Sequence, residues 1–349
     1  MRRRLAVAAA AFACVTACTA AAATPPVIRT VNPPAAAALT PDGMWVVVDG
    51  PQRTLRLFST ATGKPVGEPV VVDTRRGFGT GRIGRPIVQC CEVPYPLAVA
   101  GGAAWTLDLQ GRRVIRATAA AGVVRTTAIP MEGLGRDLTA GTSTVHVLEV
   151  RVPGAGNRID DIDPATGTLT PGPAFTGFGT PGPGMLAAGN PGVYRVTFEG
   201  ARMALVTTDG REEGGIPARI LSRVRGVTWA KSLDGCEIRR MAPDGSVRTV
   251  PPRWADRSRG GCRTRAIAGD GAGDVWVIGG NLRPGARGVV YRVSGATGRL
   301  VGRPFLVGRD PWVLVPARGG VWVGDDRSRT LRFFPAVRED GSCAPGAAP

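Results

Sequence analysis

One short motif recurs along the chain: a glycine turn, a strand of aliphatic residues carrying one aromatic side chain, and a second turn. It reads GDVWVIGG at 273–280, GGVWVGDD at 319–326 and, more loosely, DGMWVVVDG at 42–50. The aromatic marker recurs at Trp45, Trp105, Tyr194, Trp229, Trp276 and Trp322, with a weaker copy, TVHVLEV, at 144–150. The spacing of about 35 to 60 residues is typical of repeated supersecondary units that bury their apolar faces against one another.

The amino-acid sequence that follows each marker repeats as well. Residues 54–72 read TLRLFSTATGKPVGEPVVV, and residues 288–308 read GVVYRVSGATGRLVGRPFLVG. The ATG element predicts a hairpin turn in which glycine takes a positive φ. A further short strand precedes each marker, as in PLAVAGG from residue 96. Each unit is therefore predicted to be a four-stranded antiparallel sheet.

Residues 301–335, VGRPFLVGRDPWVLVPARGGVWVGDDRSRTLRFFP, resemble the repeats of streptogramin lyase-like and NHL- or YVTN-type β-propellers. The resemblance extends over 27–336 and implies an all-β fold with a single β-propeller. Seven four-stranded blades are favoured; six or eight stay open because the third and fourth units are degenerate. The last unit lacks an outer strand, and VIRTV at 27–31 is expected to supply it, closing the ring by pairing the N- and C-terminal strands. The tryptophan rings are expected to pack between neighbouring blades.

The N-terminus has the layout of an export signal. Arg2, Arg3 and Arg4 precede an apolar stretch that is short for a permanent membrane helix. The following Val-Thr-Ala-Cys resembles the bacterial lipobox, which implies lipidation at Cys18; an ordinary signal peptide cut slightly later is the alternative. We expect a signal peptide over 1–17, a lipidated tether over 18–26, the propeller over 27–336 and a C-terminal tail over 337–349. The mature protein is then extracytoplasmic and anchored to the cell membrane by its N-terminal lipid.

The formal net charge of +17 comes almost entirely from arginine, since Lys64 and Lys231 are the only lysines. Scattered arginines with abundant alanine, glycine and proline are typical of a GC-rich, actinobacterial genome. The sharper interpretation is attraction to polyanions such as wall polymers or anionic lipid. A nucleic-acid partner is not expected, because the chain has an export signal and no basic run interleaved with aromatic residues.

In an exported protein, cysteines are expected to form disulfides. Cys236 and Cys262 flank one loop, and we predict a bridge between them. Either Cys90 or Cys91 then pairs with Cys343, or the adjacent pair forms a vicinal disulfide. No metal site is expected, because cysteine ligands usually come in spaced pairs with histidine nearby and the chain has one histidine.

The largest insertion between repeats spans 73–96 and is basic and glycine-rich. It serves either as a covering loop or as a binding loop held over one face of a rigid scaffold. In the second case, the residues that contact the partner are arginines: Arg75, Arg76, Arg82 and Arg85.

Catalysis has weak support in the sequence. The resemblance to streptogramin lyase-like propellers implies a histidine base and a metal, but the chain offers only His146, and a lone histidine is more often structural. Lactonase-type propellers hold a divalent cation with oxygen ligands from several blades. Five acids end or follow marker strands and are candidates for such a rim: Asp49, Asp108, Glu149, Asp325 and Asp326. The alternative is that they cap turns in repeated hairpins, so we predict no catalytic residue, metal or cofactor.

These observations favour an exported, membrane-anchored lipoprotein that acts as a monomeric binding or interaction module in the cell envelope. Its partner is expected to be an envelope protein or an anionic envelope polymer, with the membrane contacted through the lipid anchor. The alternatives are a metal-dependent lyase or lactonase of the streptogramin lyase-like type and a purely structural scaffold.

Overall fold

The structure is a computed structural model. It describes residues 26–73, 95–108, 112–141, 143–152, 156–175, 186–188, 193–196, 202–206, 212–217, 221–224, 227–231, 237–242, 246–250, 263–270, 273–280 and 287–336. All regular elements within these ranges are β-strands. The same ranges contain no helix that is long and apolar enough to cross a membrane.

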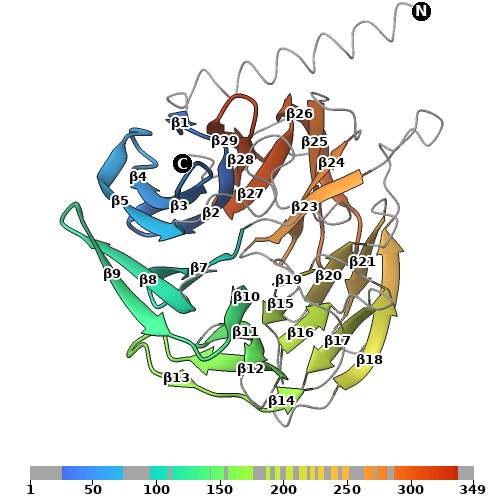
Figure 1. Cartoon of the computed structure of the whole chain (residues 1–349). Helices are drawn as coiled ribbons and strands as arrows, with labels where there is room; N and C mark the ends of the chain where they lie inside the picture. The colour runs from blue at the N-terminus through green and yellow to red at the C-terminus, as the bar shows by residue number, and fades with distance from the viewer. Residues whose placement is uncertain are drawn as a thin grey trace, which may run out of the picture.

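The strands fall into seven antiparallel sheets that follow one another around a ring (Figure 1). The first sheet comprises β2 (Pro34–Thr40), β3 (Gly43–Val48), β4 (Arg53–Phe58) and β5 (Pro65–Asp73). The second comprises β6 (Leu97–Ala100), β7 (Ala103–Asp108), β8 (Arg113–Ala120) and β9 (Val123–Pro130). The third comprises β10 (Leu134–Ala140), β11 (Val145–Val152), β12 (Gly156–Ile162), β13 (Leu169–Thr170) and β14 (Ala174–Phe175).

The later sheets repeat the plan. The fourth comprises β15 (Leu186–Ala188), β16 (Val193–Val196), β17 (Arg202–Val206) and β18 (Glu212–Pro217). The fifth comprises β19 (Leu221–Val224), β20 (Val227–Lys231), β21 (Ile238–Met241) and β22 (Val247–Val250). The sixth comprises β23 (Arg263–Gly269), β24 (Val275–Gly280), β25 (Arg287–Val293) and β26 (Leu300–Arg309). The last comprises β27 (Pro311–Ala317), β28 (Gly320–Asp325), β29 (Thr330–Pro335) and, from the other end of the chain, β1 (Ile28–Arg29).

The first strand of each sheet lies innermost, and these strands contact one another in a closed circle from β2 through β27 and back to β2. Every aromatic marker lies on the second strand of its sheet, next to this innermost strand. The ring closes through β1, where Ile28 pairs with Leu331 and Arg29 pairs with Thr330. This pairing confirms the predicted closure, because it completes the last sheet with a strand from the N-terminal end of the described chain.

The prediction of seven four-stranded blades is wrong: only six of the sheets have four strands, and the third has five. Its outer edge is divided into β13 and β14, which both pair with β12. Between them, the backbone N–H of Gly172 donates to the buried carboxylate of Asp160 at 3.0 Å. A Cβ at Gly172 would lie 1.9 Å from the carbonyl oxygen of Ile159, so only glycine allows this close approach. A side-chain acceptor thus interrupts the ladder that forms one continuous outer strand in the other blades.

The ATG hairpins have the predicted geometry. The amides of Gly63, Gly167 and Gly298 each donate to the carbonyl four residues earlier at 2.8 Å. Their φ angles are 70°, 77° and 68°, in the left-handed region that glycine adopts without steric cost. The ATG sequence motif therefore forms the same turn at the same position in three blades.

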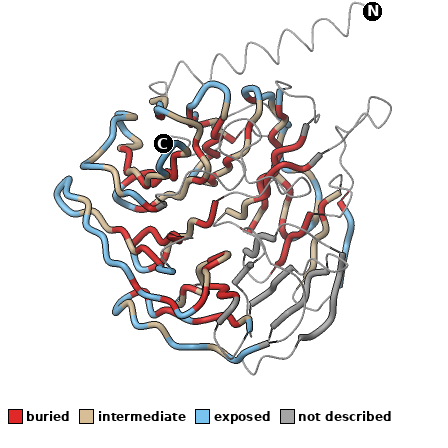
Figure 2. The backbone as a smooth tube through the Cα atoms, viewed as in Figure 1, coloured by how far each residue is buried: buried red, intermediate tan, exposed pale blue. Residues whose placement is uncertain are grey.

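The apolar core consists of layers between adjacent blades. Figure 2 shows the buried residues of the described blades in red and the exposed residues of outer strands such as β9 in pale blue. Trp105 of the second blade packs in one cluster with Val145 and Val147 of the third. Trp322 of the last blade packs with Met44 and Val46 of the first, across the closure. The expectation that the tryptophan rings pack between neighbouring blades is confirmed for these markers, and each blade depends on the next for its burial.

Candidate functional site

The five candidate acids do not converge on one ligand. Asp49 directly follows β3 and Asp108 ends β7, whereas Glu149 lies within β11 and not at its end. Each of the three faces an arginine on the third strand of its own blade. The Arg53 Nε lies 2.7 Å from Asp49 Oδ1, and the Arg113 Nη2 lies 2.5 Å from Asp108 Oδ2.

In the last blade, Asp325 stabilises the β28–β29 turn. Asp325 Oδ1 accepts the backbone N–H of Ser328 at 2.8 Å, as a turn-capping side chain does. The backbone N–H of Asp326 lies 3.3 Å from the carbonyl oxygen of Asp310. Within the described ranges, no three His, Cys, Asp or Glu side chains lie close enough to share a metal ion. The candidate acids therefore form separate ion pairs and turn contacts in their respective blades and do not line a common cation site in the described part of the chain.

His146 lies on β11 directly opposite Asp161 on β12. Its Nδ1 is 2.7 Å from Asp161 Oδ1, and the imidazole side chain is 14% exposed. The pair fixes the orientation of the ring, as a carboxylate beside a histidine commonly does. The chain contains no second histidine, so this pair does not form the histidine set of the lyase-like site.

The most unusual electrostatics lie at the other end of the third blade. Glu149 and Asp160 have no exposed surface, and Arg158 between them is 8% exposed at its side chain. The Arg158 Nε lies 2.6 Å from Asp160 Oδ1, and its Nη1 lies 2.7 Å from Oε2 of the more exposed Glu132. A single guanidinium thus supports two buried carboxyl groups and one surface carboxylate.

Among the described residues, two buried carboxyl oxygens in this cluster have no hydrogen-bond donor. Glu149 Oε2 accepts the backbone N–H of Gly133 at 2.7 Å, whereas Glu149 Oε1 and Asp160 Oδ2 are buried and accept no other hydrogen bond. Desolvation raises the pKa of Glu149 from 4.5 to about 7, and the hydrogen bond to Asp160 acts in the same direction. We therefore expect Glu149 to keep its proton to a higher pH than an ordinary glutamate does.

We expect this carboxyl pair to make folding stability depend on pH. The folded-state pKa of Glu149 lies above its ordinary value, so the folded protein binds the proton more tightly than the unfolded chain. This stabilisation is complete below about pH 4.5 and is lost as the pH rises through about 7. Its loss corresponds to about 2 to 3 kcal/mol in the free energy of unfolding.

Urea unfolding of the wild type and of the Glu149→Gln variant, compared at about pH 5 and about pH 8, isolates this contribution. The glutamine amide replaces the protonated carboxyl, so the variant should match the wild type at the lower pH and exceed its stability at the higher one. A stability difference that is the same at both pH values would show that Glu149 does not titrate as proposed.

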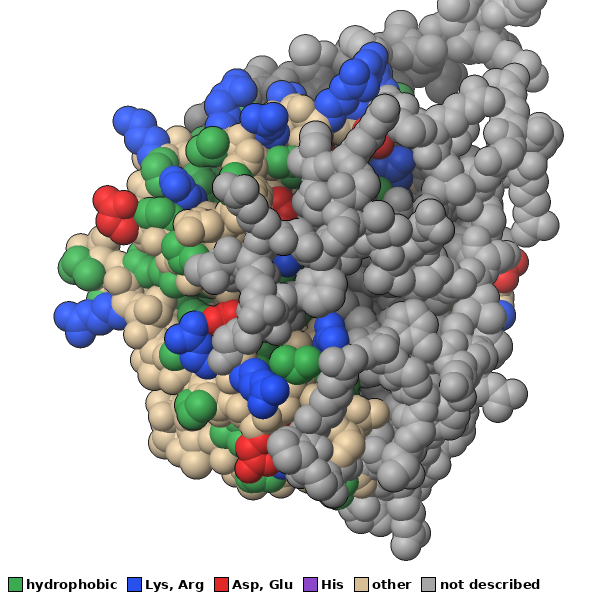
Figure 3. All heavy atoms as spheres, in the orientation of Figure 1, with side chains coloured by type: hydrophobic (Ala, Val, Ile, Leu, Met, Phe, Trp, Pro, Cys, Tyr) green, Lys and Arg blue, Asp and Glu red, His purple; other side chains and the backbone are tan. Residues whose placement is uncertain are grey.

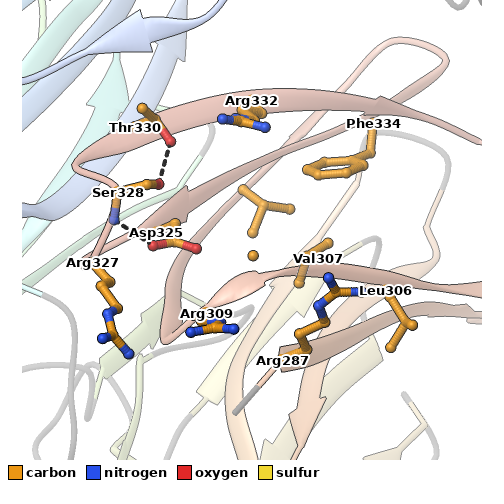
Figure 4. A pocket seen from close by; sticks show the side chains of 12 residues that line it. Arg287, Leu306, Val307, Arg309, Asp325, Arg327, Ser328, Thr330, Arg332 and Phe334 are labelled. Carbon is orange, nitrogen blue, oxygen red and sulfur yellow. Dashed lines mark hydrogen bonds between the residues drawn. The ribbon is translucent and has the colours of Figure 1, made fainter. Parts of the chain in front are cut away.

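A groove of about 480 Å³ lies at the outer side of the ring, between β26 of the sixth blade and β28 and β29 of the last (Figure 4). Four arginines line it: Arg287, Arg309, Arg327 and Arg332. Leu306, Val307 and Phe334 supply apolar surface between them. Sequence reasoning missed this site because its arginines lie in separate segments and meet only through the packing of two blades.

The binding arginines named from the sequence, Arg75, Arg76, Arg82 and Arg85, lie outside the described residues. The same is true of Cys18 and of the disulfide candidates Cys90, Cys91, Cys236, Cys262 and Cys343. These assignments stay predictions.

No protein-family model matches the chain, and no curated protein does. Solved structures do match. A catalytically inactive histidine-to-alanine variant of virginiamycin B lyase from Staphylococcus aureus, with quinupristin, has a TM-score of 0.58 at 13% identity and covers 90% of this chain and 99% of its own. The chain is a β-propeller. The predicted resemblance to the streptogramin lyase-like propellers is thereby confirmed at the level of the fold.

Two further propellers are similar to this one. The β-propeller domain of Cps50 (Swd1) from Myceliophteria thermophila has a TM-score of 0.55 at 11% identity, covering 89% of this chain and 98% of that one. YCF48 bound to a D1 peptide has a TM-score of 0.52 at 13% identity, covering 89% and 97%. Propellers of such different function share little more than the scaffold, so activity must be argued from the side chains of this propeller.

Proposed function

We propose that this propeller is an exported, lipid-anchored binding module that docks a partner protein in the cell envelope. The observation that carries the proposal is the contrast between its charged sites. The acids at the ends of the second strands are engaged by arginines or turn amides of their own blades. The groove between the sixth and last blades presents four arginines for which the described residues supply no such partner.

A protein partner fits the groove better than an anionic polymer does, because apolar side chains separate the arginines there. Elsewhere on the described part of the face in Figure 3, Lys and Arg side chains lie scattered over several blades. Scattered cations give weak, salt-screened attraction to any polyanion, whereas a groove with apolar and cationic parts selects a ligand that has both. A similar propeller, YCF48, is bound to a D1 peptide, which supports a peptide as the ligand.

The lyase or lactonase alternative finds no comparable support. The single histidine is paired with Asp161, and the acids proposed for a cation rim lie in separate blades. The likeness to virginiamycin B lyase, at 13% identity, is a likeness of fold.

Lipid anchoring predicts that a fatty acid is attached covalently at Cys18. In host cells fed an alkyne-tagged fatty acid, the wild-type protein should become labelled, and the Cys18→Ala variant should remain unlabelled and migrate as the larger, uncleaved precursor. Cys14→Ala is the matched control, because Cys14 lies within the same apolar stretch but outside the lipobox. Undiminished labelling of Cys18→Ala, or an unlabelled wild type, would contradict the anchor.

Binding is tested by crosslinking the full-length protein in the envelope of its own host and identifying the products by mass spectrometry. A discrete partner, recovered reproducibly and absent when the protein is absent, is expected. If repeated experiments recover no partner above background, the binding-module proposal fails.

A further inference from the structure

The groove between the sixth and last blades carries positive charge that nearby acidic side chains do not balance. Arg287 begins β25 and Arg309 ends β26, and the two are direct cross-strand partners. Like charges placed directly opposite each other on neighbouring strands repel, so this pair lowers stability unless an anion lies between the guanidinium groups. Figure 4 shows both side chains at the same end of the groove.

Two more arginines face this pair from the last blade. Arg327 lies in the β28–β29 turn and Arg332 lies on β29. All four arginines are exposed, and within the described part of the chain none has an ion pair or side-chain hydrogen bond. They come from four places in the fold, which are β25, the end of β26, the β28–β29 turn and β29.

The one acid in the groove is already engaged. Asp325 is 7% exposed, and its Oδ1 accepts the backbone N–H of Ser328 at 2.8 Å. Its carboxylate also packs against the backbone of β26, since a Cβ at Gly308 would fall 1.8 Å from Asp325 Oδ2. The carboxylate therefore holds the β28–β29 turn against β26, and the groove keeps an excess of positive charge.

The surface between the arginines is apolar. Leu306 is 60% exposed, so an apolar side chain of a partner can cover it. Phe334 lies opposite, and its ring stacks on Phe305 with centroids 5.4 Å apart and planes inclined at 22°. Because Phe305 lies on β26 beside Leu306 and Phe334 lies on β29, the stacked rings join the two walls of the groove through apolar surface.

We propose that the groove binds an acidic peptide segment, in which at least two carboxylate side chains flank an apolar one. The carboxylates pair with the guanidinium groups of Arg287 and Arg309 on one side and of Arg327 and Arg332 on the other. The apolar side chain covers Leu306 and Phe334. This inference rests on the proposed function as a binding module, and it names the docking site and the chemistry of the partner.

The probe is a short fluorescent peptide in which glutamates alternate with leucine and serine, and its binding to the full chain is followed by anisotropy at low salt. The double variant Arg309→Glu/Arg327→Glu should weaken binding by about a hundredfold, at about tenfold per reversed charge. Leu306→Ser should weaken it as well, without changing the net charge.

Arg125→Glu/Arg303→Glu is the matched control. Arg125 on β9 and Arg303 on β26 are likewise exposed on outer strands but do not line the groove, and the double reversal changes the net charge equally. Equal weakening in both double variants would overturn the groove as the site, because general electrostatic attraction would then explain the binding. A lysine-for-glutamate version of the peptide should not bind.

The remaining outcomes separate this inference from the function on which it rests. If the acidic peptide does not bind, but crosslinking in the host recovers a discrete partner, the module binds elsewhere and the groove proposal alone is wrong. If phosphatidylglycerol vesicles bind in an Arg309- and Arg327-dependent manner and the peptide does not, the groove is a lipid site and the peptide proposal is overturned.

Discussion

Replacing Arg158 by alanine is expected to lower the free energy of unfolding by about 3 to 5 kcal/mol. The guanidinium is the cation within ion-pair distance of both Asp160 and Glu149, and neither carboxyl group has exposed surface. Its removal leaves a buried negative charge on Asp160 without a counterion, and the proton on Glu149 compensates only in part. Urea unfolding of the full chain, read by tryptophan fluorescence, measures the loss.

Arg113→Ala is the matched control for Arg158→Ala. Arg113 occupies the equivalent position in the neighbouring blade, opposite Asp108, just as Arg158 lies opposite Glu149. Its side chain is 50% exposed, so water replaces most of what the ion pair supplies, and we expect a loss below about 1 kcal/mol. Similar losses in the two variants would show that burial of the third-blade cluster does not determine its energetics.

Replacing Trp105 by alanine is expected to cost about 3 to 5 kcal/mol of stability. The side chain is fully buried between the second and third blades, and its Nε1–H donates to the carbonyl of Ala100 at 3.0 Å. The substitution leaves a cavity at a blade interface and removes the side-chain hydrogen bond to Ala100. Thermal and urea unfolding should both shift, and the transition should broaden if the two blades lose their mutual dependence.

Trp312→Ala provides the comparison. Trp312 lies on the innermost strand β27 and is only partly buried, with the Arg265 guanidinium 5.1 Å from its ring centroid. It is not a marker residue, so its removal should cause a clearly smaller loss than that of Trp105. If Trp312→Ala is as damaging as Trp105→Ala, the tryptophans between blades are not the main stabilising layer.

The strand pattern was predictable because it is local and repeated. The marker at Trp322 specifies an apolar second strand, and the ATG text specifies a turn in which Gly298 takes a positive φ. Closure by Ile28 was predictable because the last unit lacks a strand and the N-terminal segment has an unused one. Each inference needed only the repeat and the rule that sheet edges must be paired or protected.

The parts that depend on contacts between segments were not predictable. The third blade has five strands because the backbone N–H of Gly172 donates a hydrogen bond to the Asp160 carboxylate and not to a neighbouring strand. Nothing in the repeat pattern indicates this hydrogen bond. Glu149 was singled out as an acid at a strand end, but the hairpin register that places Arg158 opposite it was not foreseen. The positive net charge of the protein was evident from the sequence. The arrangement of four arginines along one groove was not, because it depends on how the sixth and last blades pack.

The most direct test of the account is photo-crosslinking in the living host from two equally exposed positions. A photoreactive amino acid is placed at Leu306, which is 60% exposed in the groove, and separately at Val123, which is 55% exposed on the outer strand of the second blade. A discrete adduct is expected from position 306, Arg309→Glu should abolish it, and no adduct is expected from position 123. Adducts of equal intensity from both positions, or none from position 306, would contradict the claim that this propeller docks its partner through the arginine-lined groove.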